Sequence, residues 1–282
     1  DEFEFSGLSV VCTNPQTDSY ADYRCDFELW EVDSGYLMYI GCNVTWSNFF
    51  DDGTLRTFLT YGIDRQTLVD NNYAGLALPT TLAVSPMSPY YSKSLAANYD
   101  YNEMRFIDAA SKLRVPTNDK GVERKLQLLV NSDDSARLRC ARNIAATLTE
   151  LGLACETVES PTSVYEARLQ AANYDIYLGI TKLPTTADLS EFYRPWGEMS
   201  WGGLANETIY NMVNQSLADR GNYYNLHKLV ADDGRIIPVM AGYYAIYAKR
   251  GVLSDLNPAR DNVFYYTLGK TMESSKVATQ FS

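Results

Sequence analysis

The pattern of apolar and polar positions divides the chain into two main parts. Residues 1–43 alternate or run apolar in short stretches, which predicts β-strands, and the stretches FELWEV and YLMYIGCN flank Asp33-Ser34-Gly35, a sequence typical of a hairpin turn. From Lys125 onwards, apolar runs of strand length alternate with segments of helical period. Strands that alternate with helices predict an α/β fold with a mixed, mostly parallel sheet covered by helices.

The same pattern predicts the individual elements of the rest of the chain. Apolar residues between Asp51 or Asp52 and Asn71 fall on one side of a single expected helix, which carries the pair Asp64-Arg65 in its middle. A proline-rich extended loop and a short amphipathic helix that starts at Tyr99-Asp100 come next. The elements expected after residue 124 are strands at 125–130, 153–160 and 174–180, helices at 135–152, 163–173, 207–220 and 223–234, and one or two buried strands from Ile236.

Residues 181–205 interrupt the alternation of strands and helices. The segment is rich in Pro, Gly, Trp and Tyr and lacks periodicity, and a loop of this length inside a compact domain is usually functional or disordered. Flat aromatic faces beside a few charges suit a small ligand or peptide, and the alternative is a loop that packs its rings onto its own domain. The residues expected to contact a ligand are Tyr193, Arg194, Trp196 and Trp201, with Asp188 and Glu198 as polar partners.

Charge and motifs argue against several classes of function. A formal net charge of −11 disfavours binding to nucleic acid or to anionic lipid. The chain has neither a G-x-S-x-G sequence nor a glycine loop for phosphate, and no cysteine or histidine spacing typical of a metal site. The one histidine, His227, lies in an expected helix, where we interpret it as a surface or half-buried residue. We therefore expect a protein that is not an enzyme and that uses no metal or cofactor.

The five cysteines include one pair that the expected hairpin would bring together. Cys25 and Cys42 lie on either side of the turn and could form a cross-strand disulfide, but we favour two buried free thiols. An odd number of cysteines leaves at least one thiol unpaired within the chain.

Five segments, taken in order, resemble the motifs of one family. The block from Tyr36 to Val69 reads as a strand, an Asn, a loop and a helix whose core is Gly62-Ile63-Asp64-Arg65. Similar blocks follow at 73–91, 99–113, 126–160 and 174–179. Together these segments resemble the family 5 extracellular solute-binding proteins of ABC importers, which include oligopeptide-, dipeptide- and nickel-binding members.

This resemblance implies a fold and a division of the chain. The fold would be an α/β lobe of the periplasmic-binding-protein type (type II), and the chain would hold mainly the C-terminal portion of such a protein. Residues 1–43 would be a β-rich remnant of the first lobe, 44–245 the C-terminal lobe, and 246–282 a return segment toward the first lobe.

The resemblance also implies a function and a location. The function would be extracytoplasmic capture of a small solute, an oligopeptide or a similar molecule, by closure of two lobes without chemistry. The partners would be that solute and an ABC permease in the membrane, and the protein would be a monomer. It would work in the periplasm, or at the cell surface as a lipoprotein whose lipid-bearing cysteine lies upstream of residue 1.

Two positions take particular roles from the resemblance. Asp64 and Arg65 would be structural, satisfying nearby backbone ends or each other at a helix–loop junction. Peptide binders of the family carry an Asp after the Tyr-Asp strand that pairs with the amino terminus of the peptide. Counted from Tyr174-Asp175, that place falls near Pro184, which argues against recognition of a free amine there unless Asp188 substitutes.

Two other classes of function stay open. A sensory or regulatory module can be built on the same fold, although no DNA-binding or signalling segment is visible in the sequence. A glycoside hydrolase needs two carboxylates across a cleft. Asp188, Glu191 and Glu198 leave that interpretation open, although they form no paired-carboxylate motif.

Overall fold

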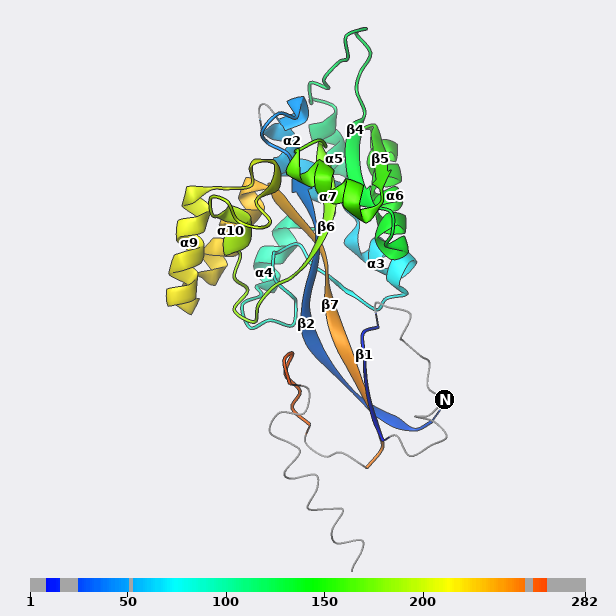
Figure 1. The fold of residues 1–282 in the computed structure, drawn as a ribbon, viewed down its shortest axis with the longest axis vertical. Coiled ribbons are helices and arrows are strands. Elements are labelled where there is room, and N and C mark those ends of the chain that lie inside the picture. The colour runs from blue at the N-terminus through cyan, green and yellow to red at the C-terminus, as the bar shows by residue number, and fades with distance from the viewer. Residues whose placement is uncertain (1–8, 16–24, 51–52, 252–255, 263–282) are drawn as a thin grey trace, which may run out of the picture.

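The computed structural model describes residues 9–15, 25–50, 53–251 and 256–262. Within these residues, one mixed sheet of seven strands runs in the order β1-β7-β2-β6-β4-β5, with β3 beside β7 (Figure 1). The strands are β1 Val10–Thr13, β2 Phe27–Cys42, β3 Leu78–Pro79, β4 Leu126–Asn131, β5 Cys155–Ser160, β6 Ile176–Lys182 and β7 Ile236–Lys249. The α-helices are α2 Thr54–Phe58, α3 Arg65–Tyr73, α4 Lys93–Ala96, α5 Glu103–Ala110, α6 Ser135–Glu150, α7 Thr162–Gln170, α8 Ser190–Tyr193, α9 Glu207–Ala218 and α10 Tyr223–Asp233.

Helices cover both faces of the sheet because neighbouring strand residues point to opposite faces. In β2, Met38 and Ile40 pack into one apolar core with α2, α3, α5 and α6. Leu37 and Tyr39 pack into the other core with α4 and with helices α7 to α10. The α/β fold with a mixed, helix-covered sheet is therefore confirmed.

The expectation that the sheet is mostly parallel is wrong for the described strands. Parallel pairing joins β4 to β5 and to β6, and these are the strands that alternate with helices in the sequence. β2 runs antiparallel to β6 and β7, and β1 and β3 run antiparallel to β7. The antiparallel strands are brought together from distant parts of the chain, so local periodicity does not reveal their direction.

The expected hairpin at Asp33-Ser34-Gly35 is a bulge inside one long strand. β2 continues through these residues from Phe27 to Cys42, and its pairing with β7 shifts register between Asp33 and Leu37. The two cysteines that the hairpin would have joined lie near the two ends of this strand, roughly 50 Å apart at the usual rise per residue. Cys25 and Cys42 are both free thiols, which excludes a disulfide between them; Cys42 is buried and Cys25 is half-buried.

The single helix expected before Asn71 is broken in two. α2 passes into a 3-10 turn at Leu59–Gly62, and α3 begins at Arg65 with Asp64 as its N-cap, whose carboxylate accepts the backbone N–H of Thr67 at 3.1 Å. The Arg65 guanidinium is buried and donates to the backbone oxygens of Thr60, Ile63 and Pro238. The structural interpretation of Asp64 and Arg65 at a helix–loop junction is confirmed. Asp51 and Asp52, the expected caps of the first helix, lie outside the described residues.

A ribbon of strands extends from the helix-covered body (Figure 1). It consists of β1, residues Phe27–Asp33 of β2 and residues Tyr243–Lys249 of β7. In the ribbon β7 is the middle strand, which pairs with β1 on one side and with β2 on the other. β7, expected as one or two buried strands from Ile236, is a single strand that runs from the body into this ribbon.

His227 is fully buried in α10 rather than at the surface or half-buried. Its side chain is 1% exposed, and its ring lies 5.8 Å from that of Tyr223. Neither ring nitrogen has a hydrogen-bond partner among the described residues. Burial lowers the pKa of His227 to about 4, because an imidazolium ion would be desolvated there.

We expect His227 to make the fold sensitive to acid. The pKa is depressed in the folded state, so the unfolded chain binds the extra proton first, and stability is lost as the pH falls from 6.5 toward 4. The shift corresponds to about 3 kcal/mol at the lower end of this window. Urea denaturation of the wild type and of His227→Leu at pH 7, 5 and 4 should show a smaller acid loss in the variant. Parallel pH curves for the two proteins would contradict this expectation.

Candidate functional site

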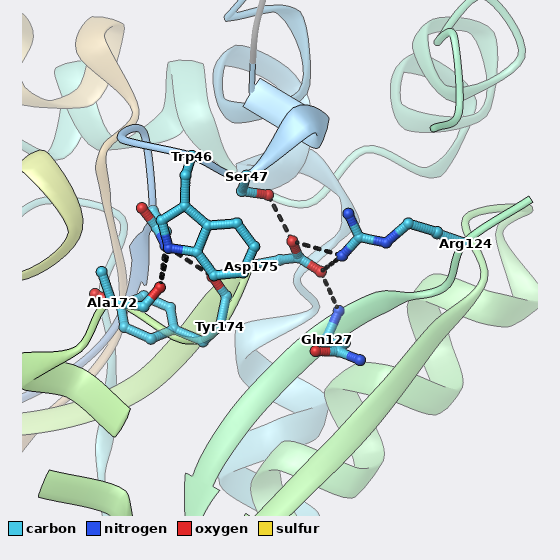
Figure 2. Close-up of polar contacts among 8 residues, drawn as sticks. Trp46, Ser47, Arg124, Gln127, Ala172, Tyr174 and Asp175 are labelled. Carbon is cyan, nitrogen blue, oxygen red and sulfur yellow. Dashed lines mark hydrogen bonds and ion pairs between the residues drawn. The ribbon is translucent and has the colours of Figure 1, made fainter. Parts of the chain in front are cut away.

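A buried carboxylate anchors β6 at its amino end. Asp175, directly before β6, is 0% exposed and accepts hydrogen bonds from the Ser47 hydroxyl at 2.6 Å and from the Gln127 backbone N–H at 2.9 Å. The Arg124 guanidinium lies 3.3 Å from both carboxylate oxygens. Figure 2 shows these groups converging on Asp175 from the loop after β2, from the residues before β4 and from β4 itself. Asp175, the second residue of the Tyr-Asp pair, therefore fixes where β6 starts against β4.

The loop after β2 is held against the turn that precedes Asp175. The Asn43 side-chain amide donates to the backbone oxygens of Ala172 and Tyr174, at 2.7 and 2.9 Å. The Trp46 indole N–H also donates to the oxygen of Ala172 (Figure 2). With its start fixed on two sides, β6 leads to the opposite edge of the sheet in a defined position.

That opposite edge carries a hollow of about 450 Å³. β4 and β6 are parallel, so their carboxyl ends meet at this edge, where ligands of open α/β sheets commonly bind. The bulge of β2 and the middle of β7 pass the same edge. The hollow is lined by Asn14, Tyr36, Met38, Tyr73, Asp133, Asp134, Ser135, Ala136, Ile180, Met240 and Gly242.

The two acidic residues of the hollow are already engaged in holding its wall. Asp133 accepts the backbone N–H and the hydroxyl of Thr162, at 2.8 and 2.7 Å, and these bonds hold the pKa of its carboxyl below the usual range. Asp134 caps α6 by accepting the backbone N–H of Arg137 at 2.9 Å, and it forms an ion pair with the same residue at 3.1 Å. Both carboxylates therefore help to hold the wall of the hollow in place.

The remaining lining of the hollow mixes polar groups, such as Asn14 and Ser135, with aromatic, sulfur-containing and aliphatic side chains. Met38 and Met240 are almost fully buried beneath it, and Ile180 is 39% exposed at its rim. Burial raises the pKa of the Tyr73 hydroxyl, which therefore stays protonated and can donate a hydrogen bond. A concave surface that offers both polar and apolar groups can contact a small solute through hydrogen bonds as well as through packing.

The six residues predicted to contact a ligand do not line this hollow. Trp201 lies in a 3-10 turn at the carboxyl end of β2, where the backbone oxygen of Gly202 accepts the N–H of Val44 at 2.8 Å. The turn is therefore at the amino edge of β6, opposite the hollow. Tyr193 is 0% exposed in the core, and Trp201 packs partly buried against the same core.

The polar members of the predicted set are tied into their own loop. Arg194 pairs with Glu191 at 2.8 Å, and the same Glu191 carboxylate accepts the backbone N–H of Glu198 at 2.9 Å. Asp188 accepts the backbone N–H of Ser190 at 2.8 Å. Trp196 alone stands out, at 95% exposure and with a left-handed φ of 61°. The structure does not bring these six side chains together in one site, and their role in ligand binding stays a prediction.

The hollow was missed because its residues come from separate segments. Tyr36, Tyr73 and Met240 carry no shared motif in the sequence. Position along the strands is the one signal in the sequence that points to the hollow. Residues at the carboxyl ends of two neighbouring parallel strands, such as Asp133 after β4 and Ile180 near the end of β6, must meet at one edge.

Solved structures share the fold of this chain. The oligopeptide-binding protein AppA from Bacillus subtilis, in complex with a nonapeptide, matches with a TM-score of 0.66 and 16% identity over 86% of this chain and 51% of its own. The ABC transporter substrate-binding protein CtaP from Listeria monocytogenes gives 0.72 and 14% over 91% and 54%. NikA from Brucella suis, in complex with Fe(III)-EDTA, gives 0.68 and 14% over 90% and 55%. The fold is thus that of periplasmic-binding-protein-like α/β proteins.

The sequence pattern of one family matches most of the chain. The family described as "Bacterial extracellular solute-binding proteins, family 5 Middle" matches residues 9–203, and the chain belongs to this family. The resemblance noted in the sequence is confirmed. The chain spans about half the length of the solved structures named above. Comparison with curated protein sequences finds no match.

Proposed function

We propose that this chain provides one lobe of an extracytoplasmic binding protein that captures a small solute for an ABC importer. The observation that carries the proposal is the hollow at the carboxyl edge of the sheet, beside the ribbon. The chain belongs to the family of extracellular solute-binding proteins, which supports the same function. Tyr73 and Ile180 of residues 44–245, together with Tyr36 of the adjoining strand β2, would contact the solute, and the rest of the first lobe would close over it. No bond is made or broken in this proposal, and no cofactor takes part.

The proposal keeps the division into lobes expected from the sequence. Residues 44–245 would form the solute-binding lobe, and 1–43 and 246–282 would belong to the first lobe and its return. β2 and β7 would connect the two lobes, because each strand lies in the helix-covered body at one end and in the ribbon at the other. The protein would act as a monomer in the periplasm or as a surface lipoprotein, and would deliver its solute to a membrane permease without binding nucleic acid. No described helix combines the length and apolar character needed to cross a membrane.

We further propose an oligopeptide or a similar small molecule as the solute. The structure of AppA from Bacillus subtilis with a nonapeptide supports this class by similarity of fold. Pro184, just after β6, offers no carboxylate for a peptide amine. The solute would then be recognised through side chains or a main chain that pack on aromatic and aliphatic surface, with the Tyr73 hydroxyl as a donor.

A binding experiment tests the proposal and compares the two candidate surfaces. A thermal-shift screen of short peptides, amino acids, sugars and nickel on the protein at its full natural length should identify a stabilising solute. Tyr73→Phe is then expected to weaken binding of that solute about 5- to 10-fold, because one hydrogen bond is lost.

Trp196→Ala serves as the matched control for Tyr73→Phe. It removes an aromatic side chain that does not line the hollow and should change the dissociation constant less than about 2-fold, measured by titration calorimetry. Loss of binding in Trp196→Ala with unchanged binding in Tyr73→Phe would instead place the solute on the aromatic loop. A full-length protein that no member of the panel stabilises would count against solute capture of these classes.

A further inference from the structure

The bulge of β2 lies where the ribbon leaves the body. Between the pairs Asp33↔Tyr243 and Leu37↔Ala241, three residues of β2 stand opposite the single residue Gly242 of β7. Bulges of this kind bend a strand and increase its local twist. Gly35, in the middle of the bulge, has a φ of 81°, a conformation that favours glycine.

Arg260, from the segment after β7, closes over this bulge. Its guanidinium donates to the Asp33 backbone oxygen at 3.2 Å and also to the Asp33 carboxylate. It donates as well to the backbone oxygen of Leu183, just beyond β6. The two charged side chains are only 9% and 17% exposed, so water screens this pair less than it screens a surface pair.

The bulge of β2, Arg260 and the backbone at Leu183 are closely packed against one another. A Cβ atom at Gly35 would lie 2.5 Å from an Arg260 nitrogen and 2.7 Å from the Leu183 oxygen. Gly35 itself accepts the Leu183 N–H at 2.9 Å, and its own N–H donates to the Asp33 carboxylate at 2.8 Å. Asp33 therefore shapes the bulge with one oxygen and holds Arg260 with the other.

This contact adjoins the hollow directly. Tyr36 follows Gly35 in the chain and lines the hollow, as does Gly242 opposite the bulge. The amino group of Lys182, which pairs with Tyr36 across β6 and β2, lies 5.8 Å from the Tyr36 ring and 6.0 Å from the ring of Tyr244 in the ribbon. The angle of the ribbon and the position of Tyr36 thus depend on the same few residues.

We propose that Arg260 is a positioning residue that fixes the ribbon and the Tyr36 side of the hollow in one arrangement, and that the bulge is the pivot about which the ribbon turns when Arg260 releases Asp33. The inference goes beyond solute capture and assigns a role to a residue outside the hollow. Its physical basis is that one guanidinium holds the bulge, the end of β6 and the returning chain together.

A distance measurement between the ribbon and the body tests this proposal without any solute. Spin labels at the exposed Cys12 of β1 and at an introduced Ala146→Cys on the exposed side of α6 report the ribbon angle by double electron–electron resonance. Cys25→Ser is included throughout, and Cys42, Cys140 and Cys155 are buried. The wild-type background should give one narrow distance distribution. Arg260→Gln and Asp33→Asn should at least double its width, although an Asn at position 33 can still accept the Gly35 N–H.

The matched control is Arg250→Gln. Arg250 pairs with Asp26 at 3.3 Å in the ribbon region, but both side chains are more than half exposed, at 65% and 71%. This variant should keep the narrow distribution. If Arg260→Gln does not fold, Asp33→Asn alone decides the test, because it removes the charge that holds Arg260 and should broaden the distribution. A width in the Arg260 variant equal to that of Arg250→Gln would overturn the proposal. Because no solute is added, this outcome is independent of whether solute capture is correct.

Discussion

Asp175→Ala is expected to lower the free energy of unfolding by about 3–5 kcal/mol. The substitution leaves the Ser47 hydroxyl and the Gln127 N–H without their acceptor in a buried site, and it leaves Arg124 without its carboxylate. The Arg124 side chain is 26% exposed and can turn toward water, so the larger share of the loss comes from the two neutral donors. Urea denaturation followed by circular dichroism measures the change.

Glu159→Ala is the matched control for Asp175→Ala. Glu159 also pairs with an arginine, Arg142, through two bonds of 2.7 and 2.8 Å, but it does so at the surface, with side chains 55% and 35% exposed. A surface pair contributes little, so we expect a much smaller loss than in Asp175→Ala. Equal losses in the two variants would mean that Asp175 is not an anchor of β6, and the position of the hollow would need another explanation.

The link from this anchor to function runs along β6. The strand starts beside Asp175 at one edge of the sheet and ends at Ile180–Lys182, beside the hollow, at the other. A weakened start allows the strand to shift against β4, and a shift at the rim alters the surface offered to a solute. A stable fold and a defined binding surface therefore depend on the same carboxylate.

The sequence predicted the helices and strands after Lys125 well because their signals are local. Apolar runs such as LQLLV and the helical period of residues 135–150 are visible within one short window. The bulge at Asp33-Ser34-Gly35 was mistaken for a turn because both features use the same residues. A glycine with positive φ and an Asp that accepts a backbone N–H fit either structure.

The parts that could not be predicted depend on contacts across the whole chain. Whether β2 turns back or continues is decided by its pairing with β6 and β7, which lie far away in the sequence. The hollow likewise combines side chains from β2, α3, β6 and β7. The loop containing Trp196 stood out by composition, but composition does not reveal which edge of a sheet a loop occupies.

Arg65→Met is expected to cost about 4 kcal/mol of stability, because it removes a donor from several buried acceptors at once. The Arg65 side chain donates to the Pro238 backbone oxygen at 2.8 Å, to the backbone oxygens of Thr60 and Ile63 at 3.2 Å, and to the Thr60 hydroxyl at 2.8 Å. Burial lowers the pKa of Arg65 to about 10, so the guanidinium remains charged at neutral pH and needs all of these partners. Methionine fills much of the same volume but donates nothing.

The effect of this substitution should reach the hollow, because Arg65 fastens α3 to β7. Tyr73 is the last residue of α3, and Met240 lies two residues after Pro238 in β7. Arg56→Met is the control, since Arg56 donates to a single backbone oxygen, that of Asp233 at 2.8 Å, and should cost about 1 kcal/mol. Amide hydrogen exchange should show faster opening of α3 and of β7 around Met240 in Arg65→Met, but not in Arg56→Met. Uniformly faster exchange in both variants would assign Arg65 to general stability rather than to the joint between α3 and β7.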